Sequence, residues 1–171
     1  MKLLWSTAIC AGLALGIAPV SAQEKTLSNV EVKSDLSAFE DSNALEFWPD
    51  LTQDLGKAIA THVNIDDQAE APRMVVEINK IAINGEPVLP ESGEFNQIEG
   101  TIALHPANTA GGNTETDANL PPMGSYALTV SAKAAGGEAP EGWVVIPPTE
   151  GDFYDVLINA YAMEVVERLE E

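Results

Sequence analysis

The sequence predicts an α+β fold in two layers, with two amphipathic helices packed on one face of a four-stranded, mostly antiparallel sheet. Three observations predict it. A helix pattern that begins near Pro49 follows the first strand pattern, three strand patterns then succeed one another without a helix, and a long apolar helix pattern ends the chain. The expected order is β-α-β-β-β-α, in a single domain spanning residues 23–171.

Residues 1–22 predict a secretory signal peptide that is cleaved on export. Lys2 supplies a positive charge, residues 3–17 form an uncharged apolar run, and Val20-Ser21-Ala22 has the form of a signal peptidase site. A membrane anchor is the alternative, but this run is shorter than the roughly 20 residues that span a bilayer. Cys10 lies inside the run, too early for lipid attachment, so no stable membrane insertion is expected after cleavage. An exported chain without a remaining cysteine favours a bacterial periplasm, with the cell exterior as the alternative.

The first strand and the first helix are predicted from their apolar spacing. Residues 27–33 alternate around Val30 and Val32, which is typical of a short strand. Pro49 fits the first turn of a helix and would break its interior, so the helix is expected to begin there. Helical spacing then relates Leu51, Leu55, Ala58, Ile59 and His62. His62 is therefore expected to pack at the boundary of the apolar face.

Three strands are predicted over residues 73–83, 95–104 and 125–133. In the first, Met74, Val76 and Ile78 share one parity and Ile81 the other, so a bulge is expected near residues 79–80. The later strands alternate in period two, with Ile98, Gly100, Ile102 and Leu104 on one face, and Tyr126, Leu128, Val130 and Ala132 inward. Direct succession predicts antiparallel pairing, whereas the helical crossover from residues 27–33 allows a parallel pair.

The last helix is predicted over residues 153–169, with an apolar surface wider than that of an ordinary surface helix. Its main stripe is expected to contain Phe153, Val156, Leu157, Ala160 and Met163, with Ile158, Ala162, Val165, Val166 and Leu169 widening it. Either this helix is central to the fold, or part of its surface contacts a partner. The exposed or buried state of the aromatic residues is open in the same way: they either pack in the core or contact a partner, since interfaces favour aromatic side chains. The candidate partner contacts are Phe47, Trp48, Trp143, Tyr161, Val165, Val166 and Leu169.

The connection over residues 105–124 is long for a compact domain, which is typical of a functional or flexible loop. Asn113, Glu115 and Asp117 are weak calcium candidates within it. Calcium prefers six to eight oxygen ligands at fixed offsets, and no such register is present. We therefore expect a flexible connector, with a partner-binding loop or a small-ligand or cation-binding module that uses residues 108–119 as alternatives.

The sequence shows no motif for catalysis, and no cofactor or metal is expected. There is no H-E-x-x-H, no G-x-S-x-G and no phosphate-binding loop. A hydrolase with a carboxylate pair is a remaining alternative, but the chain has 27 acidic residues, so proximity of two along the chain carries no information. The formal net charge of −19 is expected to repel nucleic acid and anionic membrane.

In its element order the chain resembles small periplasmic α+β proteins of Gram-negative envelopes, such as the lipopolysaccharide-assembly lipoprotein family, in which two helices pack on a four-stranded sheet. The missing lipidation motif departs from that family, so membrane anchoring does not carry over. The resemblance implies a non-catalytic, soluble periplasmic protein that binds or helps to assemble another envelope protein.

Overall fold

The computed structural model describes residues 25–67, 70–107, 121–133 and 153–169. The predicted signal peptide, the middle of the long loop with its calcium candidates Asn113, Glu115 and Asp117, and Trp143 lie outside the described residues. The elements, in chain order, are β1 (Thr26–Leu27), β2 (Asn29–Ser34), α1 (Ala44–Phe47), α2 (Leu51–Ala60), β3 (Asn64–Ile65), β4 (Arg73–Ala82), β5 (Gln97–His105), β6 (Gly124–Ser131) and α4 (Phe153–Glu167).

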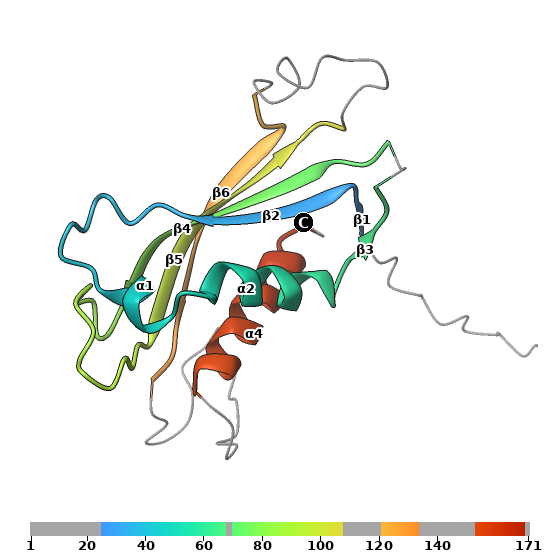
Figure 1. Cartoon of the computed structure of the whole chain (residues 1–171). Coiled ribbons are helices and arrows are strands. Elements are labelled where there is room, and N and C mark those ends of the chain that lie inside the picture. The colour runs from blue at the N-terminus through green and yellow to red at the C-terminus, as the bar shows by residue number, and fades with distance from the viewer. Residues whose placement is uncertain (1–24, 68–69, 108–120, 134–152, 170–171) are drawn as a thin grey trace, which may run out of the picture.

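A four-stranded sheet in the order β2-β4-β5-β6 forms one layer (Figure 1). Strands β4, β5 and β6 pair antiparallel, as their direct succession predicts. Strand β2 pairs parallel with β4, from Asn29 opposite Arg73 to Ser34 opposite Ile78, and α1 and α2 lie in the crossover between them. The predicted α+β class, with its mostly antiparallel sheet, is confirmed.

The predicted bulge in β4 is confirmed at Asn79. Ile78 lies opposite Gly100 and Lys80 lies opposite Glu99, so Asn79 is the extra residue. Its side-chain oxygen accepts a hydrogen bond from the Thr101 hydroxyl at 2.9 Å. The extra residue restores the pleat, which lets both Ile78 and Ile81 reach the core with no exposed surface.

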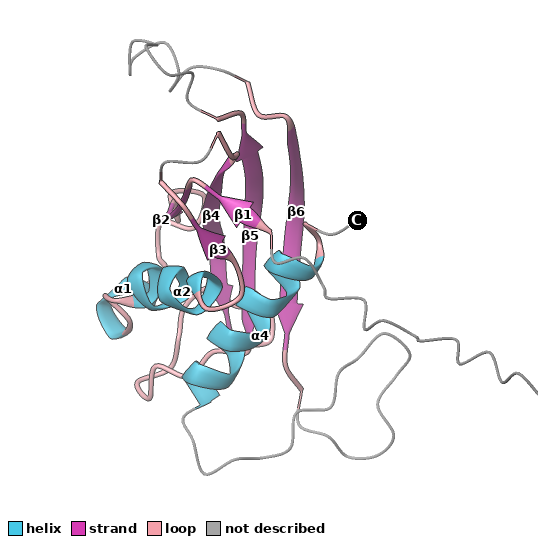
Figure 2. Cartoon of the chain, turned by 90° about the vertical axis from the view of Figure 1, so that its right-hand side faces the viewer, coloured by secondary structure: helices cyan, strands magenta, loops and turns pink. Residues whose placement is uncertain are grey.

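Helices α2 and α4 form the second layer on one face of this sheet (Figure 2). Helix α2 packs against β2 and α4, and α4 also contacts β5 and β6. The buried side of α2 consists of Leu51, Leu55, Ala58 and Ile59, as its spacing predicts. The buried side of α4 consists of Tyr154, Leu157, Ile158, Tyr161, Ala162 and Val165. Most of the apolar surface of the last helix is therefore covered within the chain, which makes this helix central to the fold.

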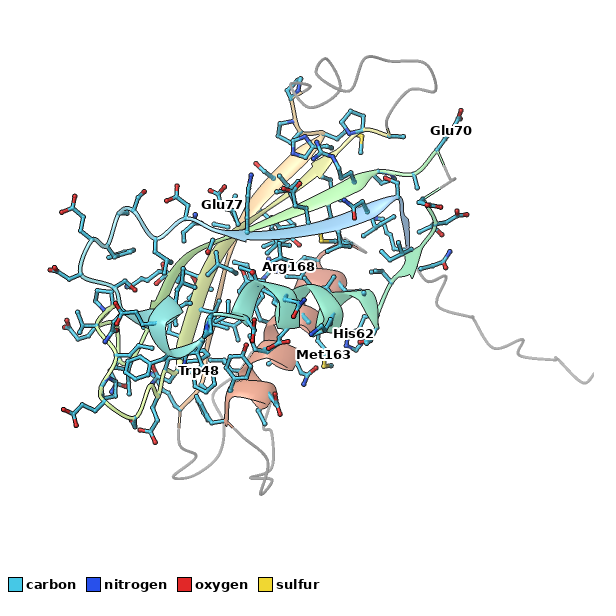
Figure 3. All side chains as sticks on the ribbon, viewed as in Figure 1. Trp48, His62, Glu70, Glu77, Met163 and Arg168 are labelled. Carbon is cyan, nitrogen blue, oxygen red and sulfur yellow. The ribbon has the colours of Figure 1, made fainter. Side chains whose placement is uncertain are left out.

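Three details of the helix prediction are wrong. His62 follows the end of α2 and is exposed, because the helix stops at Ala60. Phe153 and Met163, assigned to the apolar stripe, are 43% and 58% exposed. Figure 3 shows His62 and Met163 on the side of the helices that faces away from the sheet. Tyr154 and Tyr161 occupy the core positions instead. They were not assigned to the apolar stripe because tyrosine carries a polar hydroxyl group.

The first strand also differs from its prediction. Backbone pairing breaks at Ser28, so Leu27 belongs to β1, which pairs in parallel with β3 at the end of the crossover. Leu27 has no exposed surface and joins the core beside the helices. The short helix α1 was likewise not expected from the sequence.

The opposite face of the sheet carries no described helix and is lined by paired charges. Arg73 lies 3.4 Å from Glu31, Lys33 lies 3.6 Å from Glu77, and Lys80 lies 3.4 Å from Glu99. Figure 3 shows Glu77 pointing away from the helices. Ion pairs at a solvated surface contribute about 0.2–1 kcal/mol each. The three pairs balance each other in charge, so the excess negative charge of the chain lies elsewhere.

Candidate binding surface

Three aromatic rings pack together at the end of the molecule where α1, α2 and α4 meet. Trp48, in the turn between α1 and α2, stacks on Tyr154 of α4 with ring centroids 4.2 Å apart and ring planes 14° from parallel. Phe95 meets each of them edge-on at 6.0 Å. Such offset and edge-on contacts stabilise an aromatic pair by about 0.5–1.5 kcal/mol beyond area burial. Residues far apart in the sequence are thus fixed to one another, and Figure 3 shows Trp48 beside α4.

Hydrogen bonds hold two of these rings in place. The Trp48 indole Nε1 donates to the Gly93 carbonyl at 2.8 Å. The Tyr154 hydroxyl donates to the Asp54 carboxylate of α2 at 3.1 Å. Burial raises the pKa of Tyr154, and the negative charge of Asp54 raises it further. The phenol therefore keeps its proton and remains a donor at neutral pH.

The loop of residues 84–96 is held against α1 by Asn43. The Asn43 side chain donates to the Leu89 carbonyl at 3.0 Å and accepts from the Leu89 amide at 2.7 Å. Gly93 follows in a left-handed conformation with φ of +71°, and a Cβ atom there would lie 2.9 Å from the Phe47 ring. The loop can approach α1 this closely only because residue 93 is a glycine.

Four large apolar side chains are exposed in the segments that build this end of the molecule. Leu45 is 39%, Phe47 38%, Val88 49% and Phe153 43% exposed. We name this surface the aromatic end, and it comprises Leu45, Phe47, Trp48, Val88, Phe95, Phe153 and Tyr154. Single exposed apolar residues are ordinary, but a group at one end of a domain indicates a contact surface.

The charged residues in the stretches that build the aromatic end are all acidic. No lysine or arginine occurs between residues 34 and 56 or between residues 81 and 132. Glu46, Asp50, Glu91 and Glu94 are exposed there. The exposed charges contributed by these stretches are therefore negative, which favours a partner with positive charge.

A pocket of about 280 Å³ opens at the aromatic end. Its lining consists of Trp48, Ser92, Glu94, Phe95, Phe153 and Tyr154. A second hollow, of about 430 Å³, lies at the turn after β4, where it is lined by Asn84, Gly85, Asn96, Gln97, Ser131, Ala132 and Lys133. Asn84 and Asn96 there hydrogen-bond to each other, so their polar groups already have partners. Of these two pockets, only the one at the aromatic end combines rigid aromatic walls with a carboxylate.

The structure separates the candidate contact residues into two groups. Phe47 and Trp48 lie at the aromatic end. Tyr161 and Val165 have no exposed surface and Leu169 has 5%, so these three belong to the core and are not available to a partner. Val166 is partly buried and packs against the same core. Tyr161, Val165 and Leu169 are thus corrected as candidates, since the chain's own core covers them, whereas Val166 keeps some exposed surface.

Five members of the aromatic end were not among the sequence candidates: Leu45, Val88, Phe95, Phe153 and Tyr154. Leu45 and Val88 lie in short segments with no helix or strand period, and Phe153 was assigned to the core stripe. Tyr154 was missed because its partner, Trp48, is distant in the sequence. The lack of basic residues over residues 81–132 was the one signal in the sequence that could have drawn attention to this surface.

The described ranges contain no grouping of three histidine, cysteine, aspartate or glutamate side chains that could hold a metal ion. None of the helices described here has the length and apolar character needed to cross a membrane. The loop ends are described: Leu104 lies opposite Gly124, and the Met123 amide donates to the Leu104 carbonyl at 2.7 Å.

Comparison with known proteins gave no match to a family model, to a curated protein or to a solved structure.

Proposed function

We propose that the chain is a non-catalytic accessory protein of the bacterial periplasm, which binds a basic, partly apolar segment of another envelope protein through the aromatic end. The observation that carries this proposal is the group of exposed apolar side chains around a fixed aromatic cluster, in a part of the chain whose charges are all acidic. Protein interfaces favour aromatic residues, and complementary charge guides the correct partner to them.

The fixed geometry of the cluster supports binding rather than a purely local role. Trp48 and Tyr154 are held by each other and by hydrogen bonds to Gly93 and Asp54. A surface whose side chains are already ordered loses less entropy on association than a flexible one. Aromatic residues in such surroundings are the usual source of binding energy at an interface.

The proposed location rests on the N-terminal sequence, with its charge, apolar run and Val20-Ser21-Ala22 site. We expect the chain in cell extracts to begin at Gln23 and to be released with the periplasmic contents, which mass spectrometry of the fractionated cells measures. An intact chain beginning at Met1, found in the cytoplasm, would contradict this part of the proposal.

Site-specific photo-cross-linking in the source cells tests the proposed surface. A photoreactive phenylalanine analogue replaces Phe47, which is exposed at the aromatic end. The matched control carries the analogue at Thr129, an exposed residue of β6 on the opposite side of the sheet. We expect one envelope protein to be captured from position 47 and not from position 129.

The position of the cross-link within the captured protein decides the outcome. A segment that contains lysine or arginine next to apolar residues agrees with the proposed charge complementarity. Capture of the same protein from both positions, or of a segment without basic residues, contradicts the proposed surface. A chain that cross-links only to itself contradicts the accessory role.

A further inference from the structure

The pocket beside Trp48 suggests which side chain of a partner this surface accepts. Its walls are aromatic and its only charged lining residue is Glu94, an exposed carboxylate. Within the described part of the chain, Glu94 has no salt-bridge partner; along the sequence, the nearest basic residue before it is Lys80 and the nearest after it is Lys133. We infer that this pocket binds the guanidinium group of an arginine on the partner, which deepens the proposed function and rests on it.

The aromatic walls favour a cation over a neutral group. An aromatic ring carries negative charge density on its faces, so a cation within about 6 Å of the ring centre is attracted by about 0.5–2 kcal/mol. The chain already contains one such contact, where the Lys80 ammonium lies 5.3 Å from the centre of the Phe39 ring. In the pocket, Phe153 is 43% exposed, so its ring remains accessible to a ligand.

The combination of flat walls and a carboxylate favours arginine over lysine. A guanidinium is planar, stacks on aromatic rings and forms two parallel hydrogen bonds with a carboxylate. It is also less strongly hydrated than an ammonium group, so it loses less solvation on entering an aromatic pocket. The volume of about 280 Å³ is large enough for the head group and the methylene chain of one side chain.

Short peptides test this inference without knowledge of the natural partner. The probe is acetyl-Gly-Leu-Arg-Leu-Gly-amide, and the matched control peptide replaces arginine with citrulline, its neutral isostere. Binding is followed by NMR through the indole N–H signal of Trp48, which Trp5→Phe and Trp143→Phe variants distinguish from the signals of the other two tryptophans. We expect the arginine peptide to bind in the millimolar range. The citrulline peptide is expected to bind at least about fivefold more weakly.

Two pairs of variants assign the selectivity to the pocket. Glu94→Gln removes the charge of the lining carboxylate, and Glu91→Gln removes a charge from the same exposed loop outside the lining. We expect Glu94→Gln to reduce the preference for arginine over citrulline about fivefold and Glu91→Gln to change it less than twofold. Phe153→Leu keeps an apolar side chain but removes the ring, and it is expected to weaken the arginine peptide alone. The exposed Met163→Leu is its control.

The experiments distinguish a failure of the arginine site from a failure of the proposed accessory function. Equal binding of the two peptides, no binding of the arginine peptide at millimolar concentration, or signal changes only outside the pocket would overturn the arginine site. The proposed function would then still stand if position 47 cross-links to a basic segment. Conversely, selective arginine binding without an envelope partner would keep the site and overturn the accessory function.

Discussion

Gly100, in β5, has no room for a side chain. A Cβ atom at this position would lie 2.4 Å from the Tyr161 hydroxyl oxygen and 2.7 Å from the Glu77 carbonyl oxygen. The second contact is with backbone and cannot be relieved by rotating a side chain. We expect Gly100→Ala to lower the free energy of unfolding by about 2–3 kcal/mol, measured by urea denaturation.

Gly56 provides the matched control for that substitution. It lies in α2, and a Cβ atom there would meet only the Val32 side chain at 3.5 Å, an ordinary contact. Alanine stabilises a helix interior by about 1 kcal/mol relative to glycine, so Gly56→Ala is expected to raise the free energy of unfolding. A similar loss in both variants would show that crowding at Gly100 is not the cause.

The Tyr161 hydroxyl is buried, and among the described residues it has no hydrogen-bond partner. An unsatisfied buried polar group costs about 1–3 kcal/mol of desolvation that a phenyl ring does not. We expect Tyr161→Phe to fold normally and to raise the free energy of unfolding by about 1 kcal/mol in urea titrations. A loss of stability of that size would indicate that the hydroxyl is hydrogen-bonded in solution.

The two buried tyrosines make stability depend on alkaline pH. Burial raises the pKa of Tyr161, and burial together with Asp54 raises the pKa of Tyr154. The folded state therefore keeps both protons while the unfolded chain loses them from about pH 10 upward. This contribution to stability is fully present below about pH 10 and is lost as the pH rises through the folded pKa values. Denaturation at increasing pH should show this decline, and Tyr161→Phe should make it shallower; an equal slope in both would contradict the assignment.

At the scale of elements, Asn43 holds the loop of residues 84–96 against α1. Its two hydrogen bonds satisfy both backbone groups of Leu89, a residue that is only 3% exposed. We expect Asn43→Ala to cost about 2 kcal/mol, since it leaves two partly buried groups unpaired. Hydrogen exchange should also become faster at the Leu89 amide. Asn29→Ala, at an exposed position of β2, should change neither measurement.

The sequence was sufficient to predict the helices and strands in which apolar residues recur at a regular spacing. The change of parity between Ile78 and Ile81 predicted the bulge, because a buried strand must present its apolar residues to one layer. The crossover before Arg73 allowed the parallel pair that the structure shows, because a helix separates the two strands. These features depend on residues that are close along the chain, so a local sequence pattern is enough to predict them.

The aromatic end could not be predicted in the same way. Trp48 precedes strands β4, β5 and β6 in the sequence and Tyr154 follows them, and no periodicity relates the two residues. The orientation of α4 also depended on tertiary packing, since Tyr154 and Tyr161 turn inward in place of Phe153 and Met163. Of the sequence candidates for partner contact, Phe47 and Trp48 lie on this surface.

At the scale of the whole molecule, the excess of acidic groups repels itself. The formal net charge is −19, and the open face of the sheet accounts for none of it because its charges pair. Salt shortens the range of this repulsion, from about 30 Å at 0.01 M to about 8 Å at 0.15 M. We expect added sodium chloride to raise the free energy of unfolding by about 1 kcal/mol over that range. A decrease would instead indicate that the ion pairs of the open face contribute more than the repulsion.

The parallel pairing of β2 with β4 also bears on the order in which the sheet assembles. Strand β2 is separated from its neighbour β4 along the chain by α1, α2 and β3. Strands β4, β5 and β6 pair with segments that follow one another, so we expect them to pair before β2 docks. Until β2 docks, the Met74–Ile78 segment of β4 has an unpaired backbone edge. An apolar strand with a free edge is prone to aggregate, so we expect this interval of folding to be the one most exposed to aggregation.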